Sequence, residues 1–115
     1  MELNAYINFL IQIIVTFSST DKPDSVVVSS GKAWSRAGDK DKFTCTATGG
    51  YPTPTLKLYW TKMYDFPAEI TQGQDKVMSK RDNQAEYYCE ARVAGYPDLN
   101  MDSERKKYNV TCKYL

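Results

Sequence analysis

The 115-residue chain contains no histidine. That absence excludes histidine-based activation of a serine or cysteine nucleophile, and it removes the commonest protein ligand of zinc. The three cysteines are widely spaced and form no Cys-x-x-Cys pair, so they do not resemble a metal site. Asp39, Asp41, Asp98 and Asp102 are scattered acids without a partner base or a calcium-binding pattern. We therefore expect neither an enzyme nor a protein that uses a metal or another cofactor.

A concentrated charge of one sign is also missing. The formal net charge is +1, whereas proteins that bind nucleic acid or an anionic membrane usually carry a clustered basic excess. The one short basic run, "ERKK" at 104–107, is more typical of a solvated turn. The composition therefore argues against a nucleic-acid partner.

Long apolar runs are absent except near the N-terminus. The segment from Phe9 to Phe17 is apolar apart from two polar residues, and small residues follow it up to Thr20. This pattern is typical of a secretory signal peptide, which we predict over residues 1–20, although the first residues carry Glu2 and no basic side chain. An apolar first strand is the alternative interpretation. The run is too short to span a membrane, and no second one follows.

A sustained helical period is missing as well, and short strand-like stretches separated by turn residues fill the remainder of the chain. This pattern predicts a single all-β domain over residues 21–115, built as an antiparallel sandwich. The strands are predicted at residues 25–30, 42–48, 55–62, 75–80, 86–93 and 107–114.

Two of these strands carry a cysteine in the middle of their inward face. In "KFTCTAT" and in "AEYYCEARV", alternate residues are apolar, and Cys45 and Cys89 fall on the apolar side. Two such strands predict two sheets joined face to face, in an oxidising compartment where disulfides persist. From these residues alone, Cys45 can pair with Cys89 or with Cys112.

Two longer stretches carry a family resemblance. "CTATGGYPTPTLKLYW" resembles the Cys-x-x-x-Gly-x-Pro-x-Pro…Trp stretch of cell-adhesion domains, and "RDNQAEYYCEA" is similar to the Asp-Asn-Gly-Ala-x-Tyr-x-Cys-x-Ala run of nectin- and nephrin-like modules. Over residues 22–114 the chain thus resembles a C2- or I-type domain of the immunoglobulin superfamily. The resemblance implies an immunoglobulin-like antiparallel β-sandwich of about seven strands with one inter-sheet disulfide.

In that frame the disulfide joins Cys45 to Cys89 beneath the indole of Trp60. Tyr87 occupies the position of a tyrosine corner, whose hydroxyl bonds to nearby backbone. The expected core residues are Phe43, Leu58, Trp60 and Tyr87.

The chain departs from the family pattern just before Cys89. Gln84 stands where such modules usually carry glycine, so the tight turn there is expected to be altered. Asn83, rather than Asp82, lies where many family members keep an aspartate.

Cys112 has no partner under this pairing. It can pair with a cysteine of a neighbouring domain, link two copies of the chain into a dimer, or stay buried on the last strand. Nearby, Asn109-Val110-Thr111 is an N-glycosylation sequon, which makes Asn109 a candidate glycan site if the chain is secreted.

The resemblance implies an extracellular recognition domain of a cell-surface adhesion or immune-type receptor, which binds another protein homophilically or heterophilically. One alternative is a secreted single-domain decoy or humoral recognition factor. Another is a structural spacer of a larger ectodomain that binds nothing itself.

Candidate partner-binding residues lie on the outward face of one sheet and in two loops, because tyrosine and arginine are enriched at interface hot spots. They are Tyr59, Tyr88 and Arg92 on the sheet, and Tyr64, Tyr96, Leu99 and Met101 in the loops. We expect Tyr96 and Met101 to be exposed, and Phe66 to fold inward and fill the end of the sandwich. Trp34 is expected to cover a sheet edge rather than to bind a ligand.

Overall fold

The structure is a computed structural model that describes residues 20–112 of the chain. The predicted signal peptide lies outside this range apart from Thr20. No helix among residues 20–112 is long and apolar enough to cross a membrane. The elements are β1 (Ser25–Ser30), β2 (Trp34–Arg36), β3 (Lys40–Asp41), β4 (Phe43–Thr48), β5 (Thr55–Thr61), β6 (Ala68–Ile70), β7 (Lys76–Val77), the 3-10 helix η1 (Lys80–Asp82), β8 (Ala85–Arg92), the 3-10 helix η2 (Pro97–Leu99), β9 (Met101–Asp102) and β10 (Lys106–Thr111).

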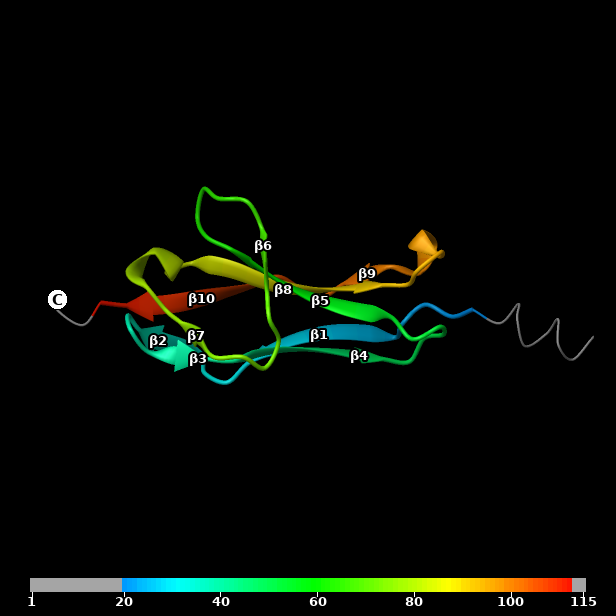
Figure 1. Ribbon diagram of the computed structural model, residues 1–115, viewed down its shortest axis with the longest axis horizontal. Coiled ribbons are helices and arrows are strands. Elements are labelled where there is room, and N and C mark those ends of the chain that lie inside the picture. Colours follow the sequence, from blue (N-terminus) through cyan, green and yellow to red (C-terminus); the bar gives the residue numbers. More distant parts are fainter. Residues whose placement is uncertain (1–19, 113–115) are drawn as a thin grey trace, which may run out of the picture.

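Two layers of strands pack face to face (Figure 1). The larger layer is a six-stranded sheet of order β2-β10-β8-β5-β6, in which β9 also pairs with β8. The opposing layer contains the pairs β1–β4 and β3–β7. Among the described strands, β2 and β10 form the one parallel pair. The predicted all-β sandwich is confirmed. Residues 20–112 form ten strands rather than about seven, because several edge pieces are only two or three residues long.

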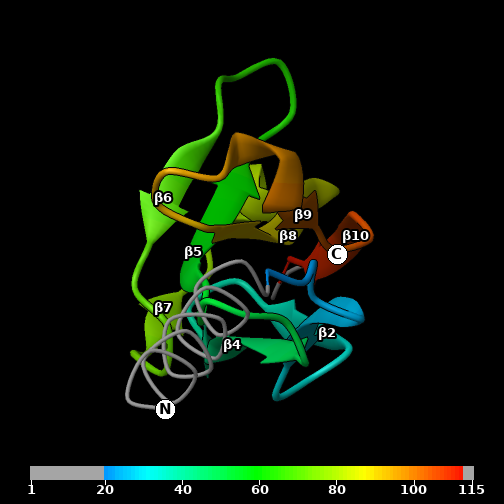
Figure 2. The same cartoon turned by 90° about the vertical axis from the view of Figure 1, so that its right-hand side faces the viewer.

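Two segments differ from the predicted strands. The strand expected at 75–80 is reduced to β7, because η1 follows closely and turns the chain toward β8. The segment around Trp34, expected to be irregular, forms β2 at the edge of the large sheet and pairs with β10. Figures 1 and 2 show the chain passing after β6 from the large sheet to β7 in the opposing layer.

The core lies between the layers and is built around aromatic rings. Phe43 of β4 contacts three rings of the opposite sheet edge-on, with centroid distances of 5.1 Å to Trp60, 5.1 Å to Tyr87 and 5.5 Å to Tyr108. Edge-to-face contacts of this kind add to the gain from burying apolar area. Leu58 is buried with them, so the four expected core residues all lie inside.

One disulfide connects the layers within this core. Cys45 of β4 and Cys89 of β8 are bonded, with an S–S distance of 2.00 Å, and they lie 44 residues apart in the chain. Cys89 is completely buried. The predicted inter-sheet bridge is thereby confirmed.

The tyrosine-corner prediction for Tyr87 is wrong. Its ring stacks against Trp60 at 5.8 Å and 22°, and this position carries its hydroxyl to the side chain of Ser30 on β1, 3.5 Å away. No hydrogen bond from this hydroxyl to backbone occurs within residues 20–112. The ring packing, rather than the local chain, therefore sets the direction of the hydroxyl.

Tyr108 makes a second polar contact between the layers. The hydroxyl of Tyr108 on β10 donates to Asp41 Oδ2 on β3 at 2.6 Å and also bonds the hydroxyl of Ser35 on β2. All three side chains are buried. Backbone N–H groups of Lys32 and Lys42 donate to the same carboxylate at 3.2 and 2.7 Å. These bonds compensate for burying the Asp41 charge.

Candidate functional site

The connection between β5 and β6, residues 62–67, stands out from the sandwich (Figures 1 and 2). We call it the β5–β6 loop. It carries three large apolar side chains with high exposed fractions, 53% for Met63, 101% for Tyr64 and 88% for Phe66. Large apolar groups exposed side by side are unusual on a protein surface, and they mark interaction sites.

The inward position predicted for Phe66 is therefore wrong. The reason is the register, in which Ala68 pairs directly with Trp60. The loop leaves and rejoins the sheet at this one pair of strands, so its residues extend away from the core instead of crossing the end of the sandwich. Tyr64, predicted as a binding candidate, is fully exposed at the same loop.

The loop has a defined backbone. The N–H of Asp65 donates to the carbonyl of Lys62 at 3.0 Å, and the N–H of Phe66 donates to Asp65 Oδ1 at 2.9 Å. Tyr64, which lies between Lys62 and Asp65 in the chain, has a backbone φ of 65°, in the left-handed region. A residue other than glycine is destabilised by about 1–2 kcal/mol in this backbone conformation. Gln84, in the turn before β8, has the same φ of 65°, so this conformation alone does not mark a binding loop.

The outward face of the large sheet is less open than predicted. Tyr59 and Tyr88 are direct cross-strand partners, and their rings stack at 5.3 Å and 25°. The guanidinium of Arg105 lies 4.4 Å from the centre of the Tyr88 ring, within reach of Glu86 at 3.9 Å. Tyr88 is consequently only 7% exposed. Its prediction as an accessible binding residue is wrong, because Arg105 from the segment before β10 covers it.

The other predicted residues lie toward the far end of β8. Arg92 is exposed and forms an ion pair with Glu90. Tyr96, before η2, is exposed, whereas Leu99 is half-buried. Met101 packs against the core cluster. The exposure expected for Met101 is wrong, because β9 pairs with β8 and directs this side chain toward the apolar interior.

The structure does not bring all the candidates into one patch. Tyr88 and Arg92 are four residues apart on one strand, a separation of about 13 Å. Figure 1 shows the η2 loop at one end of the molecule and the β5–β6 loop projecting from its flank. The β5–β6 loop is the more exposed of the two, and the sequence analysis named only Tyr64 from it as a binding candidate, assigning Phe66 to the interior. The cluster of Met63, Tyr64 and Phe66 next to Pro67 was the sequence feature that could have indicated an exposed apolar loop.

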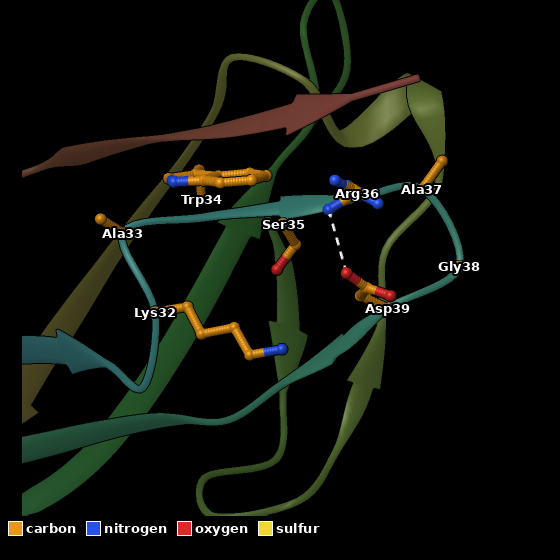
Figure 3. Close-up of a pocket in the computed structure, with 8 residues that line it drawn as sticks. All are labelled: Lys32, Ala33, Trp34, Ser35, Arg36, Ala37, Gly38 and Asp39. Carbon is orange, nitrogen blue, oxygen red and sulfur yellow. Dashed lines mark hydrogen bonds between the residues drawn. The ribbon is translucent and has the colours of Figure 1, made fainter. Parts of the chain in front are cut away.

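A hollow of about 680 Å³ is lined by one continuous segment, residues 32–39 (Figure 3). Two of its polar groups have partners within the chain, since the N–H of Arg36 donates to Asp39 Oδ2 at 3.3 Å and the hydroxyl of Ser35 bonds that of Tyr108. Within residues 20–112, no cluster of acidic or cysteine side chains could hold a metal ion.

In the described part of the chain, two titratable groups have shifted pKa values, and both are buried in the core. Burial alone raises the pKa of Asp82, but hydrogen bonds from the Ser79 backbone and the Trp60 indole, with the charge of Lys76, together hold it below its ordinary value. Burial and the bond to Asp41 raise the pKa of Tyr108 to about 12. These shifts arise from structural bonding and mark no reactive site.

The last candidates lie at the end of β10. Asn109 is exposed on the outer face, and the free thiol of Cys112 is exposed just beyond the strand, so Cys112 is not a buried, inert cysteine.

No family model matches the chain, and no curated protein matches it significantly. The immunoglobulin resemblance therefore stays a prediction.

Proposed function

We propose that this protein is an extracellular recognition domain of the immunoglobulin type that binds another protein through its β5–β6 loop. The observation that carries the proposal is the exposure of Met63, Tyr64 and Phe66 together on one projecting loop. The Cys45–Cys89 bridge supports an oxidising location, because structural disulfides persist in such compartments.

The chemistry of the loop favours a protein partner with an apolar cleft. Aromatic side chains and methionine are enriched at the centres of interfaces, where they fill pockets and exclude water. Asp65 lies between the two aromatic residues in the sequence and provides a polar group beside them, whereas the ammonium of Lys62 is directed to Asp82, 3.8 Å away. The loop's backbone hydrogen bonds reduce the conformational freedom that binding would remove.

The stacked Tyr59–Tyr88 pair and Arg105 lie on the outward face of the large sheet. Tyr59 is half-exposed and pairs with Glu69 of β6, immediately after the loop. A partner seated on the loop could therefore extend onto this face. Arg92 and Tyr96 lie farther away and serve as a second surface to test.

The test is a binding screen of the secreted full chain against an array of extracellular protein domains, the chain itself included. Tyr64→Ser combined with Phe66→Ser should weaken the interaction at least about tenfold. The melting temperature should be unchanged, because neither side chain contacts the core. Tyr51→Ser is the matched control, since Tyr51 is also an exposed aromatic residue but lies outside the loop.

The outcomes separate the alternatives. An interaction that survives the loop substitutions but is lost in Arg92→Ala with Tyr96→Ser would move the binding surface to the far end of β8. A chain that binds no domain of the array, itself included, would be a structural spacer, and the recognition proposal would be abandoned.

A further inference from the structure

We propose that Asn109 carries an N-linked glycan whose first sugar packs on the exposed indole of Trp34. The inference rests on the extracellular location in the proposed function, but not on the β5–β6 loop. Trp34 belongs neither to the core nor to the proposed binding surface, and this inference gives its exposed side chain a role.

The parallel pairing of β2 with β10 creates the arrangement. Asn109 lies directly opposite Trp34 in the register, and both are exposed on the same outer face of the large sheet. Between Asn109 and Thr111 of the sequon, Val110 points inward and is buried. The two residues that glycosylation needs are therefore on the solvent side of β10, next to the indole.

The indole is 52% exposed although tryptophan is a large apolar side chain. Figure 3 shows its ring lying flat alongside β10, on the opposite side of β2 from the hydroxyl of Ser35. A shallow hollow of about 620 Å³, mostly apolar in its lining, lies between Trp34 and the end of β10. The C–H face of a pyranose is a suitable cover for such a surface, because its weakly positive hydrogens meet the electron-rich aromatic face.

The neighbour on the other side of Asn109 leaves the attachment atom free. Gln84 donates a hydrogen bond from Nε2 to the side-chain Oδ1 of Asn109. The oxygen is the atom that keeps its place in a glycosylated asparagine, whereas the sugar is joined to Nδ2. Gln84 thus orients the amide with Nδ2 available for the glycan.

In the attachment step, Asn109 Nδ2 forms a bond to C1 of the first sugar of a lipid-pyrophosphate-linked oligosaccharide. The bond between C1 and the pyrophosphate oxygen breaks, the amide nitrogen loses one proton, and the lipid pyrophosphate leaves. The step involves no oxidation or reduction. The secretory pathway supplies the donor and the transferase to chains that carry a sequon.

The experiment uses the full chain, secreted from a eukaryotic cell line, with its glycans trimmed by endoglycosidase to one N-acetylglucosamine. Intact mass should show one sugar on the wild type and on Thr111→Ser, which keeps the sequon. Thr111→Ala and Asn109→Gln should lack it. Acrylamide quenching of tryptophan fluorescence then reports Trp34, because the other tryptophan, Trp60, is only 3% exposed.

In the protein that carries the sugar, acrylamide should quench Trp34 only weakly. Its overall quenching should fall to the level of Trp34→Ser, in which only Trp60 fluoresces. Both sugar-free variants should regain the quenching of Trp34. In NMR spectra, the N-acetyl methyl signal should show an upfield ring-current shift that disappears in Trp34→Ser.

Each of the remaining outcomes overturns one named part of this inference or of the proposed function. A secreted chain without sugar at Asn109, or a glycosylated chain with unchanged Trp34 quenching, overturns this inference alone. Trp34 shielded in a sugar-free, Cys112-linked dimer would make a second copy the occupant of the hollow. Retention of the chain in the cytosol overturns the extracellular proposal together with the inference, whereas normal partner binding by the loop variant overturns only the proposed binding surface.

Discussion

The indole Nε1 of Trp60 donates a hydrogen bond of 2.9 Å to Oδ1 of Asp82, and both side chains are buried. The second carboxylate oxygen accepts the backbone N–H of Ser79 at 2.8 Å and its hydroxyl at 3.0 Å. Lys62 Nζ lies 3.8 Å from the first oxygen. Asp82 thus ties β5 to the turn that leads into β8. The neighbouring Asn83 has a different contact, since its Oδ1 accepts the N–H of Val110.

Replacing Asp82 with asparagine should lower the free energy of unfolding by about 1–3 kcal/mol, because a buried charge-assisted network loses its acceptor charge and keeps only part of its bonding. Urea unfolding measures this change. Asp98→Asn, on the exposed helix η2, is the matched control and should be neutral. Equal stability of the two variants would mean that the Asp82 network contributes nothing net.

The same carboxylate predicts an acid dependence of stability. The pKa of Asp82 is lower in the folded chain than its ordinary value, so its ionised form contributes stability above the unfolded pKa of about 4. That contribution is lost as the pH falls through the folded value. The stability difference between wild type and Asp82→Asn should therefore shrink on acidification, as measured by urea unfolding at a series of pH values. A constant difference would contradict the shift.

Tyr108→Phe should destabilise the protein by about 1–3 kcal/mol, because it leaves the buried carboxylate of Asp41 and the hydroxyl of Ser35 without their shared partner. The apolar ring and its contact with Phe43 are kept, so the change isolates the hydroxyl. Tyr96→Phe, at an exposed tyrosine, is the control. Thermal and urea unfolding of both variants would test the claim, which fails if Tyr108→Phe matches wild type.

An alkaline dependence follows from the same residue. The pKa of Tyr108 is raised from 10.0 to about 12 in the folded chain. The raised pKa of Tyr108 therefore contributes fully to the free energy of unfolding below the pKa of tyrosine in the unfolded chain. This contribution is lost as the pH rises from the pKa of the unfolded chain to that of the folded chain. The stability of wild type should decline more steeply over that window than that of Tyr108→Phe, which lacks this titration. Parallel curves would exclude a raised pKa at Tyr108.

Removing the bridge with Cys45→Ala and Cys89→Ala should lower the free energy of unfolding by about 4 kcal/mol, because a long loop of the unfolded chain is released. That loss is a large part of the net stability of a small domain. The experiment compares urea midpoints of the double variant and of Cys112→Ser, whose thiol is free and exposed. An unchanged midpoint in the double variant would show that packing around Phe43 holds the layers without it.

The inward residues were predictable because strand periodicity is local. Alternation of apolar and polar side chains placed Phe43, Leu58, Trp60 and Cys89 on the inner faces, and the structure has them there. Tyr108 was missed as a core residue because the stretch around it, "RKKYNVT", is mostly polar, and its hydroxyl needs Asp41 from a distant strand.

The errors on the surface share another cause. Tyr88 was expected outside because of its place in the alternation, and it does lie on the outer face, but Arg105 covers its ring. Phe66 was expected inside because of its apolar character, but the pairing of Ala68 with Trp60 leaves it no interior to enter. The exposed fraction of each side chain depends on what the rest of the chain places over it.

The amino-acid order by itself determined the class of the fold and several of the buried side chains, because both follow from a two-residue period read along one strand. The same period placed Cys45 and Cys89 inward, whereas their pairing with each other was implied by the family resemblance. Only the tertiary structure decided which aromatic residues reach solvent and that Trp34 lies beside Asn109. Those relations depend on strand pairing and register between segments far apart in the chain, and no local pattern encodes them.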